Sequence, residues 1–186
     1  MCCRFLLLLG AAMEITTAAE RDIEEISRIY ARSWKAAYRG IVPQSYLDAL
    51  REDHWVAPLR RWLRAGTFSA LMACDGGRPV GAALYGPSRD EALPGWGELA
   101  ALYLLPEYYG RGYGGALFQA AAHALTKQGY RQFYLWVLEG NLRARRFYEK
   151  QRFAANGDRT VIVLAGEALT DLRYISSIGA YSAEGK

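Results

Sequence analysis

The segment 102-LYLLPEYYGRGYGGALF-118 places four glycines between an apolar strand pattern and an amphipathic helix pattern. Because glycine has no β-carbon, the main chain there can adopt left-handed dihedral angles and come close to a ligand. The first amides of the following helix have no partner within it, and the helix dipole is positive at this end. Together these properties predict a loop that binds a diphosphate group through main-chain amides. The glycines are Gly110, Gly112, Gly114 and Gly115.

Two other phosphate-binding motifs fit this loop less well. Gly110, Gly112 and Gly115 satisfy the G-x-G-x-x-G pattern of dinucleotide-binding folds. In those folds the first glycine lies in the tight turn that ends the strand, whereas residues 106–109 intervene here. The loop of nucleotide triphosphatases needs a Lys-Ser/Thr pair after its last glycine, and Ala116 stands there instead. The loop therefore implies no magnesium site.

A second segment downstream, 141-NLRARRFYEK-150, helps to interpret the glycine loop. The strand, proline, aromatic residue and glycine loop of residues 102–115 resemble the acetyl-CoA signature of the GCN5-related N-acetyltransferase (GNAT) family. Residues 141–150 resemble a second signature of that family, and residues 13–50 are similar to its opening strand and helices. The resemblance thus covers residues 13–176, and two signatures in the right order are more specific than one.

The order of hydrophobic patterns predicts the fold class. Thr17 to Glu20 match a capping box, which predicts that a helix begins there. One strand-helix-strand unit among mostly antiparallel strands argues against a doubly wound dinucleotide fold. We expect a single-domain α/β protein with a GNAT-like fold, a mixed, mostly antiparallel sheet of about seven strands flanked by helices. Strands are expected at 14–16, 68–74, 80–85, 97–105, 133–137, 159–164 and 168–176, and helices at 23–37, 45–50, 55–63, 115–128 and 141–151.

Composition limits the classes of protein that remain. A chain of 186 residues, 52% of them hydrophobic, fits one domain with a substantial core. The net charge of +4 is spread along the chain, which favours a small anionic ligand over nucleic acid. Cys2, Cys3 and Cys74 are odd in number and lack metal-ligand spacing, so we expect neither a disulfide framework nor a metal site. A cytoplasmic location fits this cysteine usage.

The first twelve residues contain the short apolar run Phe5–Leu9. This run is shorter than the apolar core of a secretory signal, about 7 to 15 residues, and much shorter than a membrane span. We therefore expect neither export nor membrane association. We interpret residues 1–12 as an N-terminal extension that need not belong to the fold, and residues 13–182 as the N-acetyltransferase domain that the resemblance implies.

The resemblance implies acetyl-CoA as co-substrate, bound largely by the main chain. Amides of the glycine loop would hold the diphosphate, with the Arg111 side chain near a phosphate. Amides at the end of the preceding strand would polarise the thioester carbonyl. The family usually has Gln or Arg where this chain has Tyr109. Arg143, Arg145 and Arg146 could reach the ribose phosphate, although a solvated helix face is expected for at least two of them. The implied coenzyme-binding residues are Leu102, Tyr103, Leu104, Gly110, Arg111, Gly112, Tyr113, Gly114, Gly115, Asn141 and Tyr148.

The resemblance also implies catalytic residues. Tyr148 matches the family tyrosine that protonates the leaving thiolate, and a phenol of pKa near 10 suits a thiol of pKa about 8.5. Asn141 fits both a helix N-cap and a hydrogen bond to the coenzyme. Glu98 matches an acidic position that other members use as general base, directly or through water. Tyr148 could instead be a core tyrosine and Glu98 a solvated residue. On strict alternation, Tyr103 would point to the opposite face of the strand from Glu98.

The acceptor is the least determined part of the reaction. Family resemblance implies that Trp34 and Tyr38 wall its pocket, although aromatic residues four apart also pack in cores. We expect a primary amine of a small molecule or a peptide. The alternatives are another acyl-CoA donor, a non-catalytic acyl-CoA sensor and a dinucleotide-binding module. The closing strands could also support a homodimer.

Overall fold

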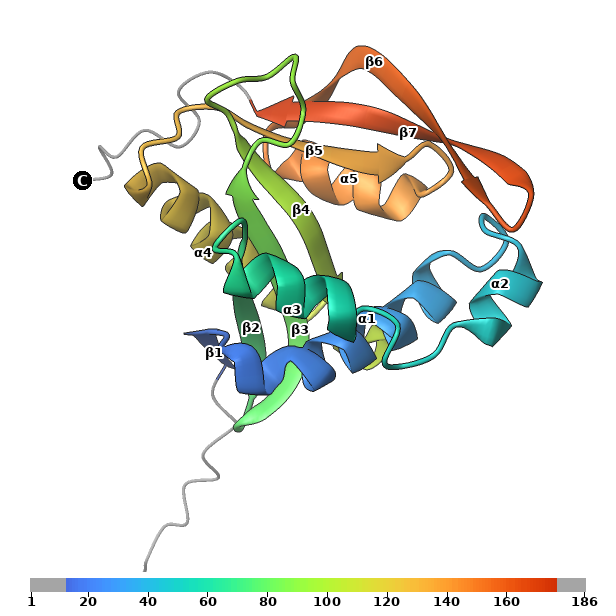
Figure 1. Cartoon of the computed structure of the whole chain (residues 1–186), viewed down its shortest axis with the longest axis horizontal. Helices are drawn as coiled ribbons and strands as arrows, with labels where there is room; N and C mark the ends of the chain where they lie inside the picture. Colours follow the sequence, from blue (N-terminus) through green and yellow to red (C-terminus); the bar gives the residue numbers. More distant parts are fainter. Residues whose placement is uncertain (1–12, 177–186) are drawn as a thin grey trace, which may run out of the picture.

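The structure is a computed structural model that describes residues 13–176 (Figure 1). The predicted extension at residues 1–12 and the last six residues of the predicted domain, 177–182, lie outside the described residues. The strands are β1 (Met13–Thr17), β2 (Ser69–Asp75), β3 (Arg78–Pro87), β4 (Gly97–Leu104), β5 (Phe133–Leu138), β6 (Phe153–Leu164) and β7 (Glu167–Ser176). The helices are α1 (Ile23–Ala37), α2 (Gln44–Ala49), α3 (Val56–Arg64), α4 (Tyr113–Lys127) and α5 (Leu142–Lys150), with 3-10 turns η1 (Glu20–Asp22) and η2 (Pro106–Tyr108).

The strands form one seven-stranded sheet in the order β1-β2-β3-β4-β5-β7-β6. Neighbouring strands are antiparallel except β4 and β5, which are parallel and are connected through α4. The tight β2–β3 hairpin turns at Gly76 and Gly77, both with positive φ, as an Asp-Gly-Gly sequence predicts. This arrangement confirms the predicted mixed, mostly antiparallel sheet flanked by helices.

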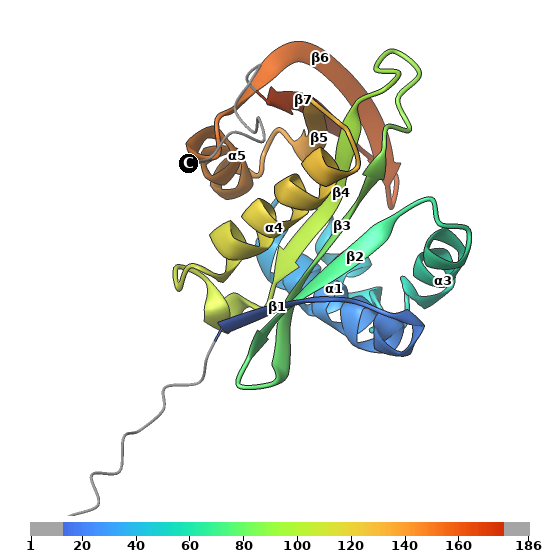
Figure 2. The ribbon, with the colours of Figure 1, turned by 90° about the vertical axis from the view of Figure 1, so that its left-hand side faces the viewer.

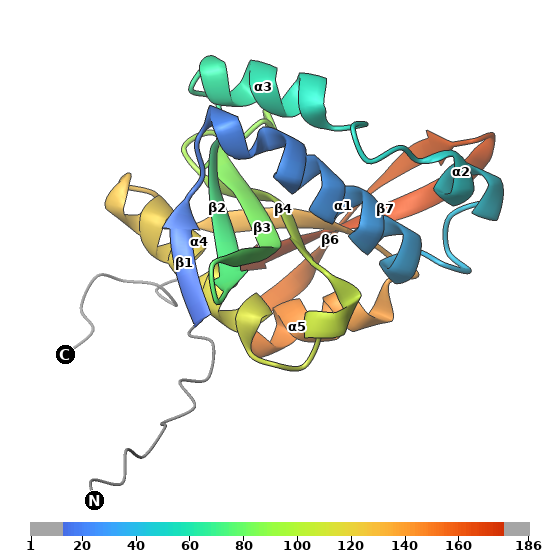
Figure 3. The same ribbon diagram turned by 90° about the horizontal axis from the view of Figure 1, so that it is seen from below.

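Helices cover both faces of the sheet (Figures 2 and 3). Ile23, Ile26 and Ile29 recur at three-residue spacing on α1 and are fully buried against β2, β3 and β4. Leu117 and Leu125 of α4 are buried on the other face, which α5 also covers. Burying each such side chain stabilises the fold by about 1.5–3 kcal/mol, so these helices fix the two surfaces between which the site lies. Within residues 13–176, no helix is both long and apolar enough to span a membrane.

Two helix starts differ from the sequence prediction. The capping box predicted at Thr17 to Glu20 is wrong in its position, because Thr17 still pairs with Leu71 in the sheet. Asp22 instead accepts a hydrogen bond from the Ala19 N–H at 2.8 Å, which caps the 3-10 turn before α1. Helix α4 begins at Tyr113, two residues earlier than expected.

A β-bulge in β4 changes which side chains share a face. Tyr85 pairs with Leu99 and Leu84 with Ala101, so Ala100 is the extra residue. The bulge reverses the alternation beyond it, and Glu98 and Tyr103 therefore point to the same face, the one covered by α1. The prediction that they point to opposite faces is wrong because it assumed an unbroken strand.

Candidate active site

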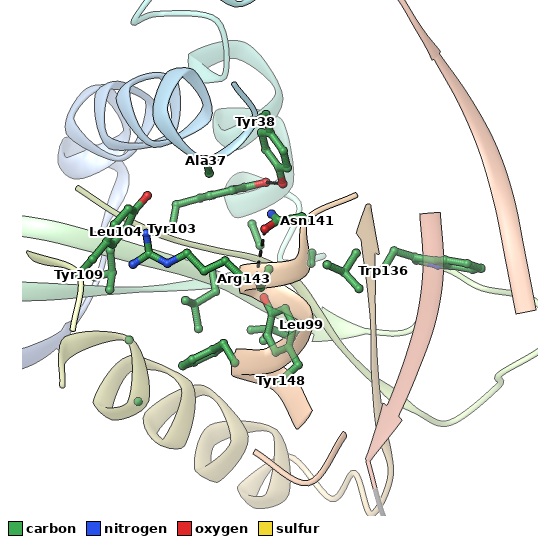
Figure 4. Close-up of a pocket in the computed structure, with 18 of the residues that line it drawn as sticks. Ala37, Tyr38, Leu99, Tyr103, Leu104, Tyr109, Trp136, Asn141, Arg143 and Tyr148 are labelled. Carbon is green, nitrogen blue, oxygen red and sulfur yellow. Dashed lines mark hydrogen bonds between the residues drawn. The ribbon is translucent and has the colours of Figure 1, made fainter. Parts of the chain in front are cut away.

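Strands β4 and β5 separate soon after they meet. They pair only through Gly97 with Phe133 and Glu98 with Tyr134, although both strands continue for several residues. A cavity of about 330 Å³ lies where they separate (Figure 4). Beyond the paired residues, the facing edges of β4 and β5 carry main-chain donors and acceptors that the two strands do not exchange with each other. An extended ligand with amide groups could pair with these edges as an added strand does.

The cavity brings together residues that are far apart in the sequence, from β4, the glycine loop, β5, α5 and the end of α1. Most of the predicted coenzyme-binding residues are among them: Leu102, Tyr103, Leu104, Gly110, Gly112, Gly114, Gly115, Asn141 and Tyr148. Tyr38, predicted for the acceptor, lines it too. The lining also contains residues that the sequence analysis did not assign to the site: Ala37, Leu99, Ala100, Ala101, Tyr109, Trp136, Val137, Ala144 and Phe147.

The glycine loop ends at the N-terminus of α4. Gly112 is the N-cap, with the left-handed φ of +89° that glycine adopts easily. Helical hydrogen bonding begins where the Ala116 N–H donates to the Gly112 carbonyl at 3.1 Å. The amides of Tyr113, Gly114 and Gly115 are therefore without helical acceptors and lie at the positive end of the dipole. Such a helix start can bind an anion at the cavity.

The space around the glycines is consistent with a ligand-binding loop. A β-carbon at Gly110 or Gly115 would meet nothing within 4 Å, so these main-chain segments are open. A β-carbon at Gly114 would meet the Leu104 Cδ1 atom at 3.2 Å and the Phe147 ring at 3.5 Å. The loop is therefore close-packed at Gly114 and open at Gly110 and Gly115, which leaves room for a phosphate chain.

Two loop residues predicted to bind the coenzyme have side chains elsewhere. Arg111 places its guanidinium 5.3 Å from the centre of the Tyr108 ring, and neither Arg111 nor Tyr113 belongs to the lining. Tyr113 is 7% exposed and packs in the core between α4 and the sheet. Any contribution of these two residues to an anion site is therefore best assigned to their main-chain amides.

Helix α5 places a positively charged side chain, Arg143, close to the glycine loop. The Arg143 guanidinium stacks on the Tyr109 ring, with its carbon 3.4 Å from the ring centre (Figure 4). Stacking on an aromatic face is favourable and holds the positive charge in place. Both residues line the cavity. Tyr109, where the family usually has Gln or Arg, therefore holds an arginine supplied by α5.

Asn141 and Tyr148 come from the second signature, and both line the cavity (Figure 4). Asn141 is the N-cap of α5, and its Oδ1 accepts a hydrogen bond from the Ala144 N–H at 3.1 Å, which leaves the Nδ2 donors for another partner. Tyr148 is 8% exposed, and burial, with a smaller effect of Tyr103, raises the pKa of its hydroxyl well above the usual value. At neutral pH Tyr148 is therefore a protonated donor.

Aromatic residues from β4 and the end of α1 form another part of the wall. The Tyr38 and Tyr103 hydroxyl oxygens are 3.3 Å apart and share a hydrogen bond (Figure 4). Burial is the main cause that raises the pKa of both phenols. Trp34 packs with its ring centre 4.6 Å from that of Tyr38 and is not part of the lining. Of the two residues predicted for the acceptor, Tyr38 lines the cavity, and Trp34 supports it from behind.

Glu98 lies outside this lining. Its carboxylate is 2% exposed and accepts hydrogen bonds from the Tyr134 hydroxyl at 2.9 Å and from the Arg89 Nε at 3.0 Å. The alternative of a solvated residue is wrong, because Glu98 joins the β3–β4 connection to β5 as a buried acceptor. Its prediction as general base gains no support from this position.

Comparisons with known proteins agree with this geometry. The model of the acetyltransferase (GNAT) family matches residues 23–153. The chain is 35% identical over 131 residues to the uncharacterized N-acetyltransferase YuaI of Bacillus subtilis, covering 68% of this chain and 72% of that protein. It is 27% identical over 143 residues to the spermidine N(1)-acetyltransferase of Thermoplasma acidophilum, covering 76% and 88%.

Among solved structures, the PaiA N-acetyltransferase of Thermoplasma acidophilum in complex with coenzyme A superposes with a TM-score of 0.70 at 21% identity. The match covers 89% of this chain and 98% of that one and shows a common fold. The match to the family model extends over more than half of the chain and includes both signatures. The protein therefore belongs to the GNAT family of N-acetyltransferases.

Proposed function

We propose that the protein transfers an acetyl group from acetyl-CoA to a primary amine of a small molecule or a peptide. The observation that carries the proposal is the separation of β4 from β5, because the cavity there is lined by the four glycines, Asn141 and Tyr148 together. Two similar proteins of Thermoplasma acidophilum support the donor and the acceptor. The PaiA N-acetyltransferase was solved with coenzyme A, and the spermidine N(1)-acetyltransferase is named for spermidine.

The residues of the cavity fit coenzyme A. The free amides of Gly114 and Gly115 at the start of α4 would hold the diphosphate, and Arg143 would add a positive charge nearby. The unpaired edges of β4 and β5 would pair with the amide groups of the pantetheine arm. Main-chain binding of this kind tolerates changes of side chain, such as Tyr109.

Acetyl-CoA supplies the acetyl thioester, and the chain supplies orientation and proton transfer. Amides of β4 near Leu102 and Tyr103 would polarise the thioester carbonyl. Tyr148 keeps its proton at neutral pH and would donate it to the sulfur as negative charge develops there. The Tyr38 and Tyr103 wall would hold the acceptor beside the thioester, so that the reacting atoms meet in a fixed orientation.

Calorimetry and a turnover assay test the proposal. We expect heat of binding with acetyl-CoA and with coenzyme A and none with NADH, followed by thiol release when amines are added. Heat of binding with NADH alone would reject the proposal in favour of a dinucleotide-binding module. Binding of acetyl-CoA without thiol release from any amine would favour a sensor. Faster thiol release with a longer acyl-CoA would identify a different donor.

A further inference from the structure

Asp171 lies on β7, next to the Tyr38 and Tyr103 wall that would hold the acceptor. It pairs with Leu138 of β5 and with Thr160 of β6. Directly paired residues on neighbouring strands point to the same face, and so do residues two apart on one strand. Asp171 therefore shares a face with Leu138 and Leu169, which pack in the cluster formed with Tyr38, Tyr103 and α2. The Asp171 carboxyl group thus belongs to an apolar and aromatic layer next to the cavity.

The charge of Asp171 acts on two tyrosines of the cavity wall. The negative charge of Asp171 contributes to raising the pKa of Tyr38 and of Tyr103, after the larger effect of burial. Both tyrosines line the cavity. The residue on β5 diagonal to Asp171 is Trp136, which lines the cavity as well. Asp171 is not itself a lining residue, so its carboxylate lies next to the aromatic wall rather than in the cavity.

Asp171 differs from several acidic residues in this part of the protein, which pair with arginines. Arg89 pairs with Glu98, Arg173 with both Asp90 and Asp158, and Arg159 with Glu139. Between residues 13 and 176, no hydrogen bond or ion pair to the Asp171 side chain is found. A partly buried carboxylate without a partner is unfavourable, and the binding of a cation would offset that cost.

Burial alone raises the pKa of the Asp171 carboxyl group to about 6. The group is therefore ionised at neutral pH and more basic than an ordinary aspartate. The titratable or charged groups near it are Tyr38 on α1, Tyr103 on β4 and, two residues along β7, Arg173, whose charge is engaged by two aspartates. A carboxylate of this basicity can accept a proton in a reaction at neutral pH.

We propose that Asp171 binds the ammonium group of the acceptor and takes the proton that the nitrogen must lose before it attacks. This inference rests on the proposed function and adds an acceptor class: amines that arrive as cations. It also offers a general base in place of Glu98, whose carboxylate accepts hydrogen bonds from Arg89 and Tyr134.

The protons balance in this scheme. One proton passes from the ammonium group to Asp171, and the neutral nitrogen can then attack. As the N–C bond forms and the C–S bond breaks, the nitrogen loses its second proton to solvent and the sulfur takes the proton of Tyr148. Asp171 then releases its proton to solvent and Tyr148 regains one, so each turnover yields amide, free thiol and one net proton.

Kinetics with Asp171→Asn test the proposal, with acetyl-CoA as donor and spermidine and butylamine as acceptor probes. We expect kcat/KM for the amine to fall by about 100-fold, while the Kd of acetyl-CoA stays unchanged. The control is Glu167→Gln, which removes one exposed negative charge from the same strand and should leave both values unchanged. Wild-type kcat/KM in Asp171→Asn would overturn the proposal.

The pH profile gives a signature that a merely structural role would not produce. In the wild type, kcat/KM should fall as the pH drops below about 6, where Asp171 becomes protonated. In Asp171→Asn the amine must arrive neutral, so kcat/KM should instead rise up to the pKa of the amine, near about 10. A profile with the same shape in both proteins would overturn the proposal.

A binding measurement keeps the test independent of turnover. With coenzyme A bound, calorimetry should detect spermidine binding to the wild type and to Glu167→Gln, and at least about tenfold weaker binding to Asp171→Asn. Equal binding to all three proteins would overturn the role of Asp171 and leave the proposed function intact. Failure of coenzyme A itself to bind would instead reject the proposed function.

Discussion

The two halves of the site recognise their ligands by different means. The coenzyme half, formed by the glycine loop, the β4–β5 gap and α5, offers main-chain amides and glycines whose positions depend on backbone geometry. The acceptor half, formed by the end of α1, α2, β7 and the outer part of β5, offers aromatic rings and the Asp171 carboxylate, which has no partner within residues 13–176. In the proposed function, the first half would bind the coenzyme that all members of the family share. The second half depends on side chains, whose identity the backbone geometry does not restrict.

This difference explains why one half can be identified by a motif and the other cannot. A main-chain anion site requires glycines at set positions, because left-handed φ angles and close packing exclude other residues. Side chains that recognise an amine can come from several elements, and here they come from α1, β4 and β7. Changes in the two halves should therefore affect different steps, and the predictions below test that separation.

The largest effect is expected from Tyr148→Phe, in the coenzyme half. Removing the hydroxyl removes the proton donor to the sulfur, so kcat should fall by about 100-fold. The affinity for acetyl-CoA, measured by calorimetry, should not change. Tyr130→Phe, which alters a partly buried tyrosine outside the cavity, is the matched control and should keep full activity. Equal kcat in Tyr148→Phe and wild type would remove Tyr148 from the acid role.

Glu98→Gln tests whether the buried ion pair between Glu98 and Arg89 serves stability or activity. We expect the free energy of unfolding to fall by about 2 kcal/mol, because Gln replaces a charged acceptor of the Tyr134 and Arg89 hydrogen bonds. Denaturant unfolding measures this change, and kcat should stay at the wild-type value. Glu20→Gln, at an exposed pair with Arg64, should leave the stability nearly unchanged. A stable but inactive Glu98→Gln protein would make Glu98 the base and contradict the role given to Asp171.

Gly112→Ala should weaken only the coenzyme half. Alanine in a left-handed conformation costs about 1–2 kcal/mol. If relief of that strain turns the first amides of α4, the affinity for acetyl-CoA should fall by about tenfold. Gly157→Ala, with φ of +95° on β6 and nothing within 4 Å of its new β-carbon, carries the same backbone strain far from the loop. Both variants should melt earlier, and a matching loss of affinity in Gly157→Ala would show that strain alone explains the effect.

Asp171→Asn is expected to change stability in the opposite direction. The pKa of Asp171 is 3.8 as the reference value and about 6 in the folded protein, so ionisation destabilises the fold. This destabilisation is absent below about pH 4, grows as the pH rises to about 6 and is complete above it. Asp171→Asn should therefore melt higher than the wild type at pH 7 and no higher at pH 4. A variant less stable at pH 7 would show that Asp171 has a stabilising partner.

Sequence patterns predicted the strand order along the chain, the main helices and most of the residues that line the cavity in its proposed coenzyme half. They did so because Gly112, Asn141 and Tyr148 serve backbone geometry or chemistry that few other residues can provide. They could not locate Asp171, because its position depends on the pairing of β7 with β5, a long-range contact. They also misjudged Tyr103 relative to Glu98, because the bulge at Ala100 leaves no clear trace in the residue types.

The brief pairing of β4 with β5 has a mechanical consequence. Only two residue pairs join β4 to β5, so the backbone hydrogen bonds between strands β1–β4 and β5–β7 form a narrow seam, although side chains of both parts pack in one core. A ligand that pairs with both edges would add backbone hydrogen bonds across that seam, where the chain itself makes few. Substrate would then act as a missing strand, and the rigidity that it brings would extend from the cavity to the whole β5–β7 region.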